Sequence, residues 1–427
     1  MRAAGTGQSD ETGMASVPLT IGLIEQLSDE MRTNHPALKA ARGRATAAMF
    51  QAEGIRKWQD PGFKLGGAVN SGRGPDAREE GDLIYGVEQT LPLFGKLEAV
   101  RAVAAADAAT ESERGELLLQ LQRRDLSKVL FELALADRAI VLGREDLKWL
   151  ETTLEIANAR LQAGTATQLD FIRLQNERAR RTNQLATEIS RRAESLVTLN
   201  RLLARPPLTA FSILTLPDIA PALAFTPTLI RYATNSEPRL LVASREVTAA
   251  EARIRATRKS KIPDMTVAVQ GQQFHGDGGF RQGMVTVGFN LPWLNAGRYR
   301  KDLARDQHRH KSALQDRESL ALEVVNEIHH RITSIDAARR EGLLYRDDIL
   351  PRSERALAVA MAGWTGSSME VRDVLETRRM LVEAKSMIAR AVAMQWIEMS
   401  DLVLCCGLSD LEMLLELGAP ETPAITP

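Results

Sequence analysis

The stretch QTLPLFGKLEAVRA, residues 89–102, places a Leu-Pro break between an alternating segment and a long charged helix. The stretch FNLPWLNAGRYRKDLA, residues 289–304, repeats this arrangement about two hundred residues later. Proline cannot donate a hydrogen bond to a sheet, but it fits the first turn of a helix. Each break therefore predicts a joint at which a strand ends and a helix begins. The residues that mark the two joints are Pro92, Gly95, Pro292 and Gly297.

The rest of the chain also occurs in two copies. NHPALKAARGRATAA at 34–48 resembles NSEPRLLVASREVTAA at 235–250, and the other landmarks keep an offset of 200 to 203 residues. A constant offset over so many landmarks indicates an internal duplication. We therefore expect a poorly ordered N-terminus at 1–18, a first repeat at 19–207, a linker at 208–225, a second repeat at 226–417 and a disordered tail at 418–427.

Four short segments, two in each repeat, alternate between apolar and small or polar residues. In one of the clearest, Val285, Val287 and Phe289 alternate with Thr286 and Gly288. This period predicts strands with one face toward lipid or a core and the other toward water. About eight strands are the fewest that close a barrel, and open sheet edges are not tolerated in lipid. Several copies of the chain must therefore contribute strands to one closed sheet.

The helix after the first joint carries a coiled-coil seam. Leucine or isoleucine recurs at every seventh position, at Leu119, Leu126, Leu133, Ile140, Leu147, Leu154 and Leu161. At about 1.5 Å per residue, the segment 97–161 would be roughly 100 Å long, which no compact domain of this mass contains. The second repeat carries a shorter seam that Pro351 interrupts. The predicted fold is mainly α with a small β part: long helical hairpins plus four strands per subunit.

Composition and motifs exclude several classes of function. The chain has 55 Lys and Arg against 55 Asp and Glu, so no net field attracts nucleic acid. No stretch approaches the roughly 18 apolar residues of a membrane-spanning helix. The start of the sequence lacks the apolar run of a secretory signal, so no signal peptide is expected within it.

Nothing in the sequence indicates catalysis, a cofactor or a metal site. There is no phosphate-binding loop, no dinucleotide turn, and no nucleophile with a plausible base. His308 and His310 are two residues apart, and His329 and His330 are adjacent. Neither spacing gives the i, i+4 pair that places two metal ligands on one helix face. We therefore expect a protein that is not an enzyme.

Two long motifs and one short one carry a family resemblance. They are REDLKWLETTLEIANARLQAGTATQLDFIRLQNE at 144–177, YRDDILPRSERALAVAMAGWTGSSMEVRDVLETRRMLVEAK at 345–385, and LPLFGK at 91–96. Together with the duplication they closely resemble TolC-type outer-membrane efflux proteins. LPLFGK and DDILPRSERAL are most similar to the branch paired with heavy-metal cation exporters of the resistance-nodulation-division class. The resemblance covers roughly 19–417.

The resemblance implies a homotrimer. Each subunit would supply four strands to one β-barrel in outer-membrane lipid and its helices to one periplasmic tunnel. The trimer would be a passive exit duct for solutes such as heavy-metal cations or drugs. Its partners would be a periplasmic adaptor (membrane fusion) protein and an inner-membrane resistance-nodulation-division pump.

The resemblance also implies roles for residues at the far ends of the helical hairpins. The tips that would contact the adaptor are Gly164, Thr165 and Ala166 in the first hairpin and Trp364, Gly366 and Ser367 in the second. Trp364 stands where a tyrosine is usual, and Gly366 stands one place before the usual glycine. Asp373 and Glu376 match the acidic pair that narrows the periplasmic mouth, and a spacing of three puts them on one helix face.

Alternatives stay open at this point. Asp373 and Glu376 could instead pair with arginines of the same helix, namely Arg372, Arg378 and Arg379. The basic run Arg253, Arg255, Arg258, Lys259 and Lys261 fits either lipid headgroups at the membrane edge or a solvated helix end. The whole chain could be a soluble oligomeric coiled-coil scaffold, or a degenerate copy that no longer exports.

Overall fold

The computed structural model describes residues 16–55, 59–69, 81–274, 278–366 and 368–419. The chain divides into two compact units, each assembled from segments that are far apart in sequence. The first unit contains residues 1–40, 116–240 and 320–427, and the second contains residues 41–115 and 241–319.

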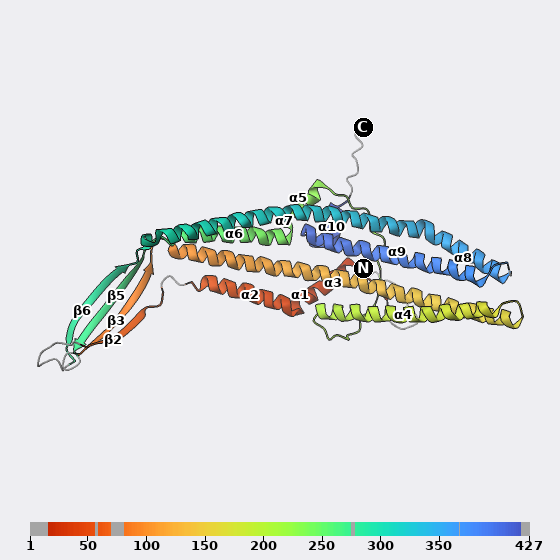
Figure 1. The fold of residues 1–427 in the computed structure, drawn as a ribbon, viewed down its shortest axis with the longest axis horizontal. Helices are drawn as coiled ribbons and strands as arrows, with labels where there is room; N and C mark the ends of the chain where they lie inside the picture. Colours follow the sequence, from red (N-terminus) through yellow and green to blue (C-terminus); the bar gives the residue numbers. More distant parts are fainter. Residues whose placement is uncertain (1–15, 56–58, 70–80, 275–277, 367, 420–427) are drawn as a thin grey trace, which may run out of the picture. The chain divides into compact units, whose positions relative to one another are not determined.

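The second unit contains a four-stranded antiparallel sheet with the order β2-β3-β5-β6 (Figure 1). The strands are β2 (Gly62–Val69), β3 (Gly81–Pro92), β5 (Asp264–Phe274) and β6 (Phe280–Phe289). The central pair, β3 with β5, joins strands from the two sequence repeats. The four segments of alternating sequence are therefore strands, as predicted, and they belong to one sheet.

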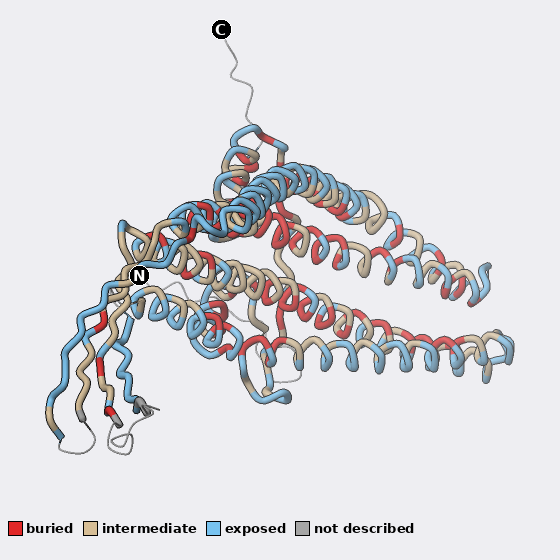
Figure 2. Tube along the Cα trace, turned by 60° about the vertical axis from the view of Figure 1, so that its left-hand side comes forward, coloured by how far each residue is buried: buried red, intermediate tan, exposed pale blue. Residues whose placement is uncertain are grey.

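The register of this sheet collects its apolar side chains on one face. Phe63 lies opposite Val87, Val87 opposite Val269, and Val269 opposite Val285, so one row of apolar residues crosses all four strands. The apolar row is exposed: 69 % for Phe63 and 69 % for Val285. Figure 2 shows mostly exposed and half-buried residues along these strands, whereas most of the buried residues lie along the helices. The sheet thus presents an apolar face that the chain itself does not cover.

In its described residues, the first unit is helical except for one pair of short strands. The helices that lie wholly within it include α1 (Ile21–Asn34), α4 (Gln168–Leu202), α5 (Pro227–Ser236), α9 (Val371–Cys406) and α10 (Leu411–Leu417). Its core is aliphatic, and Phe131 stacks on Trp396 with ring centroids 5.7 Å apart. A parallel pair joins β1 (Ser16–Pro18) to β4 (Ile213–Thr215).

This parallel pair uses parts of two predicted segments. Of the N-terminus predicted at 1–18, Ser16–Pro18 forms β1, and residues 1–15 lie outside the described part. The linker predicted at 208–225 contains β4. Three-residue strands carry too little periodicity to be recognised in the sequence. At the other end, α10 ends at Leu417, and 420–427 are outside the described residues.

A further helix, α8 (Leu350–Thr365), also lies within the first unit. Other helices have residues in both units: α2 (Pro36–Glu53), α3 (Lys96–Gln162), α6 (Pro238–Lys259) and α7 (Ala296–Leu344). In α3 the predicted seam is buried at Leu126, Leu133 and Ile140 and half-buried toward Leu161. Gly143 allows close packing, because a Cβ there would lie 3.1 Å from Leu185 of α4.

Pro351 does not end the helix that contains it. Residues Tyr345–Ile349 form a π-helical turn between α7 and α8, and Pro351 lies in the first turn of α8. Because proline has no N–H to donate to an earlier carbonyl, a local change of spacing lets the helix continue. The interruption predicted at Pro351 is therefore a π turn.

No helix in the described part is by itself long and apolar enough to span a membrane. The pair α9 and α10 meets that criterion jointly, by length and composition, but the two helices are bent by 82°.

Gly407 provides a test of the packing at the end of α9. It caps the helix with a φ of +65°, and a Cβ there would clash with the Ser236 carbonyl. We expect Gly407→Ala to destabilise the protein by about 2–4 kcal/mol, because left-handed strain and overlap with backbone add together. Chemical denaturation measures the effect. Gly43→Ala is the control: it lies inside α2 with no atom near its Cβ, and should stabilise by up to about 1 kcal/mol. Equal effects would contradict this account.

Candidate functional site

The strand-to-helix joints lie where the sequence placed them. β3 ends at Pro92, Phe94 and Gly95 have φ values of 57° and 74°, and α3 begins at Lys96. Gly95 is thus required by its backbone conformation. At the second joint Pro292 opens a short 3-10 turn, Pro292–Asn295, and Gly297 lies in the first turn of α7.

The first hairpin tip is an exposed capped turn. α3 ends at Gln162 and α4 begins at Gln168. Gly164 has a φ of +74°, and nothing lies within 4 Å of its Cβ position. Thr167 caps α4 by accepting a hydrogen bond from the Asp170 N–H at 3.2 Å. Gly164 and Thr165 are exposed and Ala166 is half-buried, so this tip is accessible to a partner.

The second tip is built differently. α8 ends at Thr365, and Gly366 caps it with an ordinary φ of −84°, so this glycine is not required by its conformation. Ser367 lies outside the described residues. Glu370 starts α9 through a capping box with Asp373: each side chain accepts a hydrogen bond from the other residue's backbone N–H.

Trp364 is an internal residue of the tips. Its exposed fraction is 3 %, and it packs in a cluster with Leu150 and Val371. The guanidinium of Arg160 lies 5.0 Å from its ring centroid and donates to its carbonyl. The resemblance implied that Trp364 contacts the adaptor, but its side chain instead joins the two tips from inside. An adaptor contact at the second tip would fall on its exposed neighbours.

The acidic pair of α9 has unequal surroundings. The Asp373 carboxylate accepts from the Glu370 N–H at 3.4 Å and lies 3.8 Å from Arg372 Nε. Glu376 is exposed and interacts electrostatically with Arg379. Asp373 therefore has a local role as a helix cap, which the sequence motif alone did not indicate.

An ion-pair network with buried carboxylates lies about two to four helical turns inside the tips. Arg378 Nε donates to Asp146 at 2.7 Å, and Arg379 pairs with Glu177. Arg181 Nε lies 3.2 Å from both carboxylates. The carboxylate side chains are 2 % exposed for Asp146 and 7 % for Glu177. We name this set, Asp146, Glu177, Arg181, Arg378 and Arg379, the tip network.

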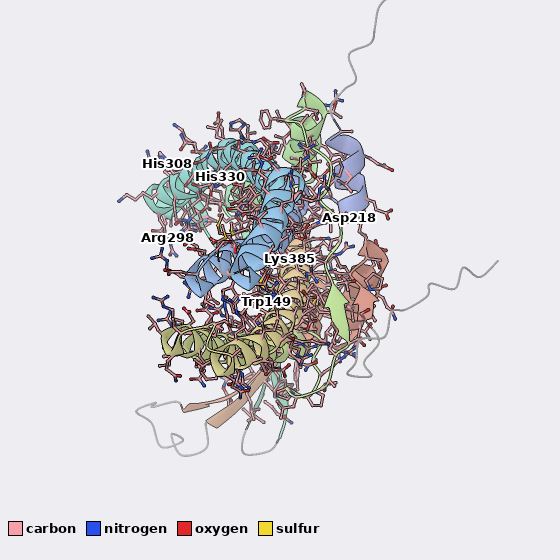
Figure 3. The ribbon with its side chains drawn as sticks, turned by 90° about the vertical axis from the view of Figure 1, so that its right-hand side faces the viewer. Trp149, Asp218, Arg298, His308, His330 and Lys385 are labelled. Atoms are coloured by element: carbon pink, nitrogen blue, oxygen red, sulfur yellow. The ribbon has the colours of Figure 1, made fainter. Side chains whose placement is uncertain are left out.

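The tip network joins helices that are distant in sequence. Asp146 belongs to α3, Glu177 and Arg181 to α4, and both remaining arginines to α9. Arg378 also lies 4.7 Å from the ring of Trp149, which Figure 3 places between the α3–α4 and α8–α9 hairpins. Arg378 and Arg379 thus pair with carboxylates of other helices, while Arg372 lies within salt-bridge range of Asp373 and Arg379 also interacts with Glu376.

The network favours the charged form of Glu177. Burial by itself raises the pKa of Glu177, but hydrogen bonds and charge from Arg379 and Arg181 outweigh it and lower the pKa below the usual value. The sequence did contain a signal for this site. Asp146 follows Leu142 and precedes Leu150 at intervals of four, on a stripe that is otherwise apolar.

The comparisons with known proteins agree with this architecture. The model of the outer membrane efflux protein family matches residues 27–205 and 229–403. The chain belongs to this family. Family membership places it in the outer membrane, and it confirms the resemblance found in the sequence. The relatives are channel proteins rather than enzymes.

A curated relative is the pyoverdine export outer membrane protein OpmQ of Pseudomonas aeruginosa. It is 25 % identical over 302 residues, which cover 68 % of this chain and 62 % of OpmQ. The chain thus aligns with less than two thirds of that relative's length.

Solved structures share the fold. CusC superposes with a TM-score of 0.79 at 15 % identity, covering 91 % of this chain and 92 % of CusC. VceC of Vibrio cholerae gives 0.75 at 18 % identity, covering 90 % and 96 %. The outer-membrane channel OprN gives 0.76 at 15 %, covering 95 % and 98 %. These likenesses confirm the predicted mainly helical fold with a small β part.

Asp146→Ala tests the tip network. It would leave Arg378 without its buried partner and Arg181 with Glu177 alone, so we expect a loss of about 3 kcal/mol in unfolding free energy. Hydrogen exchange around Trp149 should also increase. The matched control is Glu151→Ala, which removes an exposed pair with Arg178 at 3.2 Å and should cost less than about 1 kcal/mol. A cost for Asp146→Ala no larger than that of the control would contradict a structural role.

Proposed function

We propose that the chain is the outer-membrane channel component of a tripartite efflux system, acting as a passive exit duct. The observation that carries this proposal is the four-stranded sheet with its exposed apolar face. Among the described residues, β2 pairs only with β3 and β6 only with β5, so both edges can take a further strand. A homotrimer would join such edges into one closed barrel and satisfy them in lipid.

For the solute that passes through this duct, we propose only a chemical class. The relative OpmQ is a pyoverdine export protein, whereas the sequence resemblance favours heavy-metal cations or drugs. A passive duct is compatible with either kind of solute. A periplasmic adaptor and an inner-membrane resistance-nodulation-division pump would select the solute and supply the energy. We propose no enzymatic activity for the chain itself.

The joints and the repeats also have proposed roles. Pro92 with Gly95, and Pro292 with Gly297, would mark the change from barrel to periplasmic tunnel in each repeat. The order of two helices, two strands, a long helix and a return helix occurs twice along the chain. This order supports a duplication with repeats at 19–207 and 226–417.

The acidic pair would form the periplasmic gate. In a trimer, Asp373 and Glu376 would give two carboxylates from each subunit around one opening, which favours cations and disfavours anions. The tip network lies directly inside this pair along α9, and its burial favours a closed, well-packed tip. Opening would require the α8–α9 hairpin to move against α3 and α4.

A soluble scaffold is the second candidate, and the exposed sheet disfavours it. In water, an uncovered apolar row that includes Phe63 and Val285 is an aggregation hazard. A degenerate copy without export would keep the fold and lose the transport, which a functional assay distinguishes.

We expect the exposed first tip to contact the adaptor. Thr165→Cys, in full-length protein co-expressed with the adaptor, should cross-link to it through a short bis-maleimide, because Thr165 is exposed next to Gly164. Ser190→Cys is the matched control, exposed on α4 but more than twenty residues from the tip. The native Cys405 and Cys406 are buried and should not react. Cross-linking of Ser190→Cys alone would argue against a tip contact.

We expect the full-length protein to conduct ions in planar bilayers. The double variant Asp373→Asn with Glu376→Gln should raise conductance or reduce cation preference, since it removes the proposed ring of charge while asparagine can still cap α9. Reversal potentials in a salt gradient measure the preference.

The control is Glu323→Gln with Glu354→Gln, which neutralises two exposed carboxylates away from the tips. Unchanged conductance and selectivity in the gate variant would reject the gate. A chain that stays in the soluble fraction and never conducts would reject the channel and favour the scaffold. A conducting chain whose deletion leaves cells equally sensitive to metals and drugs would favour a degenerate copy.

A further inference from the structure

The end of the second unit at which the sheet meets the helices is built as one connected region. Lys96 Nζ, at the start of α3, pairs with Asp264 at 2.6 Å. The Asp264 N–H donates to Asn290 Oδ1 at 2.6 Å, and Lys259 Nζ donates to the Phe94 carbonyl at 3.3 Å. The end of α6 and both strand-to-helix joints therefore meet in one place.

The basic residues of this region fall into two groups. Arg253 pairs with Asp107 at 2.7 Å, and Arg255 pairs with Glu251 at 3.1 Å. By contrast, no carboxylate in the described part of the chain lies in salt-bridge range of Arg258, Lys261, Arg300 and Lys301, all of which are exposed. In the basic run at 253–261, the arginines farther from the joints thus pair with carboxylates. Arg258 and Lys261, nearer the joints, have no carboxylate partner among the described residues.

Exposed apolar side chains stand in the same region. Phe94 is 73 % exposed, Trp293 is 58 % exposed and Leu294 is 75 % exposed. Phe94 follows the end of β3 along the chain, and Trp293 and Leu294 follow the end of β6. We name the unpaired cations and these three apolar residues together the joint collar.

We propose that the joint collar is a docking surface for anionic phospholipid headgroups of the membrane leaflet that faces the helices. Large apolar side chains that follow an apolar strand face favour the boundary between acyl chains and headgroups. Exposed Lys and Arg without carboxylate partners complement lipid phosphate. In the second unit, the exposed cations and the exposed apolar residues both lie near the ends of the strands that lead into the helices. This inference rests on the proposed membrane channel, and it adds a lipid preference that a barrel alone does not require.

The test uses the full-length protein in zwitterionic detergent, with phosphatidylglycerol and phosphatidylcholine as probes. The variant Arg258→Gln, Lys261→Gln, Arg300→Gln and Lys301→Gln should weaken phosphatidylglycerol binding by roughly tenfold or more, because each cation near an anionic surface adds attraction. Native mass spectrometry counts the bound lipids, and thermal melting follows the stabilisation. Phosphatidylcholine binding should change little.

Two control variants make the outcome decisive. The charge-conserving set Arg258→Lys, Lys261→Arg, Arg300→Lys and Lys301→Arg should keep the preference. The distant set Arg144→Gln, Lys148→Gln, Arg180→Gln and Arg390→Gln, equally exposed on α3, α4 and α9, should also keep it. Unchanged lipid binding in the first variant, or an equal loss in the distant set, overturns the proposal. So does a thermal shift that inorganic phosphate reproduces in full.

These outcomes are separable from a failure of the proposed function. A protein that conducts in planar bilayers but shows no lipid preference rejects only the joint collar. A protein that does not enter a membrane rejects the channel as well.

Discussion

The pairing of β3 with β5 is the interaction on which the rest of the structure depends. It joins residues 82–92 of one sequence repeat to residues 264–274 of the other in one antiparallel ladder. Without it each repeat would hold an isolated two-stranded hairpin, which is marginally stable in water. With it, the register places the apolar residues of both hairpins on one face and leaves β2 and β6 as edges. The demand for further strands at those edges, and hence for further copies of the chain, follows from this pairing.

The sequence predicted what depends on local periodicity. The alternation around Val285 predicted a strand, the sevenfold recurrence from Leu119 to Leu161 predicted the long helix, and Pro92 predicted the end of β3. It did not predict the short β1–β4 pair or the partners of Arg378 and Arg379. Those depend on contacts between segments nearly two hundred residues or more apart, and a charged residue on a helix carries no local mark of its distant partner. Trp364 shows the same limit, because the resemblance implied an adaptor contact and gave no sign that packing within the subunit buries this side chain.

Asp373 has a structural role in the described chain, and the proposed gate would give it a second one. As the third residue of α9 it completes a capping box, which fixes where the helix starts. A carboxylate that caps is also held in a defined direction, which a ring of gate charges requires. Glu376, one turn later, has no such cap and is exposed. The two members of the pair are therefore unlike: one is positioned by its own helix, and the other is free to respond to ions or to Arg379.

The chain has equal numbers of basic and acidic residues, but the two signs of charge are not evenly distributed over the structure. The buried carboxylates Asp146 and Glu177 are matched by arginines of other helices, so these charges hold helices together at the tips. The cations near the joints, such as Arg258 and Lys301, are exposed and lack such partners among the described residues. A charge in water costs little when unpaired, whereas a buried one must be matched. The buried pairs are thus explained by packing within the subunit. The exposed cations near the joint at Trp293 are not explained by packing within the subunit. Their positive charge is complementary to an external anionic surface.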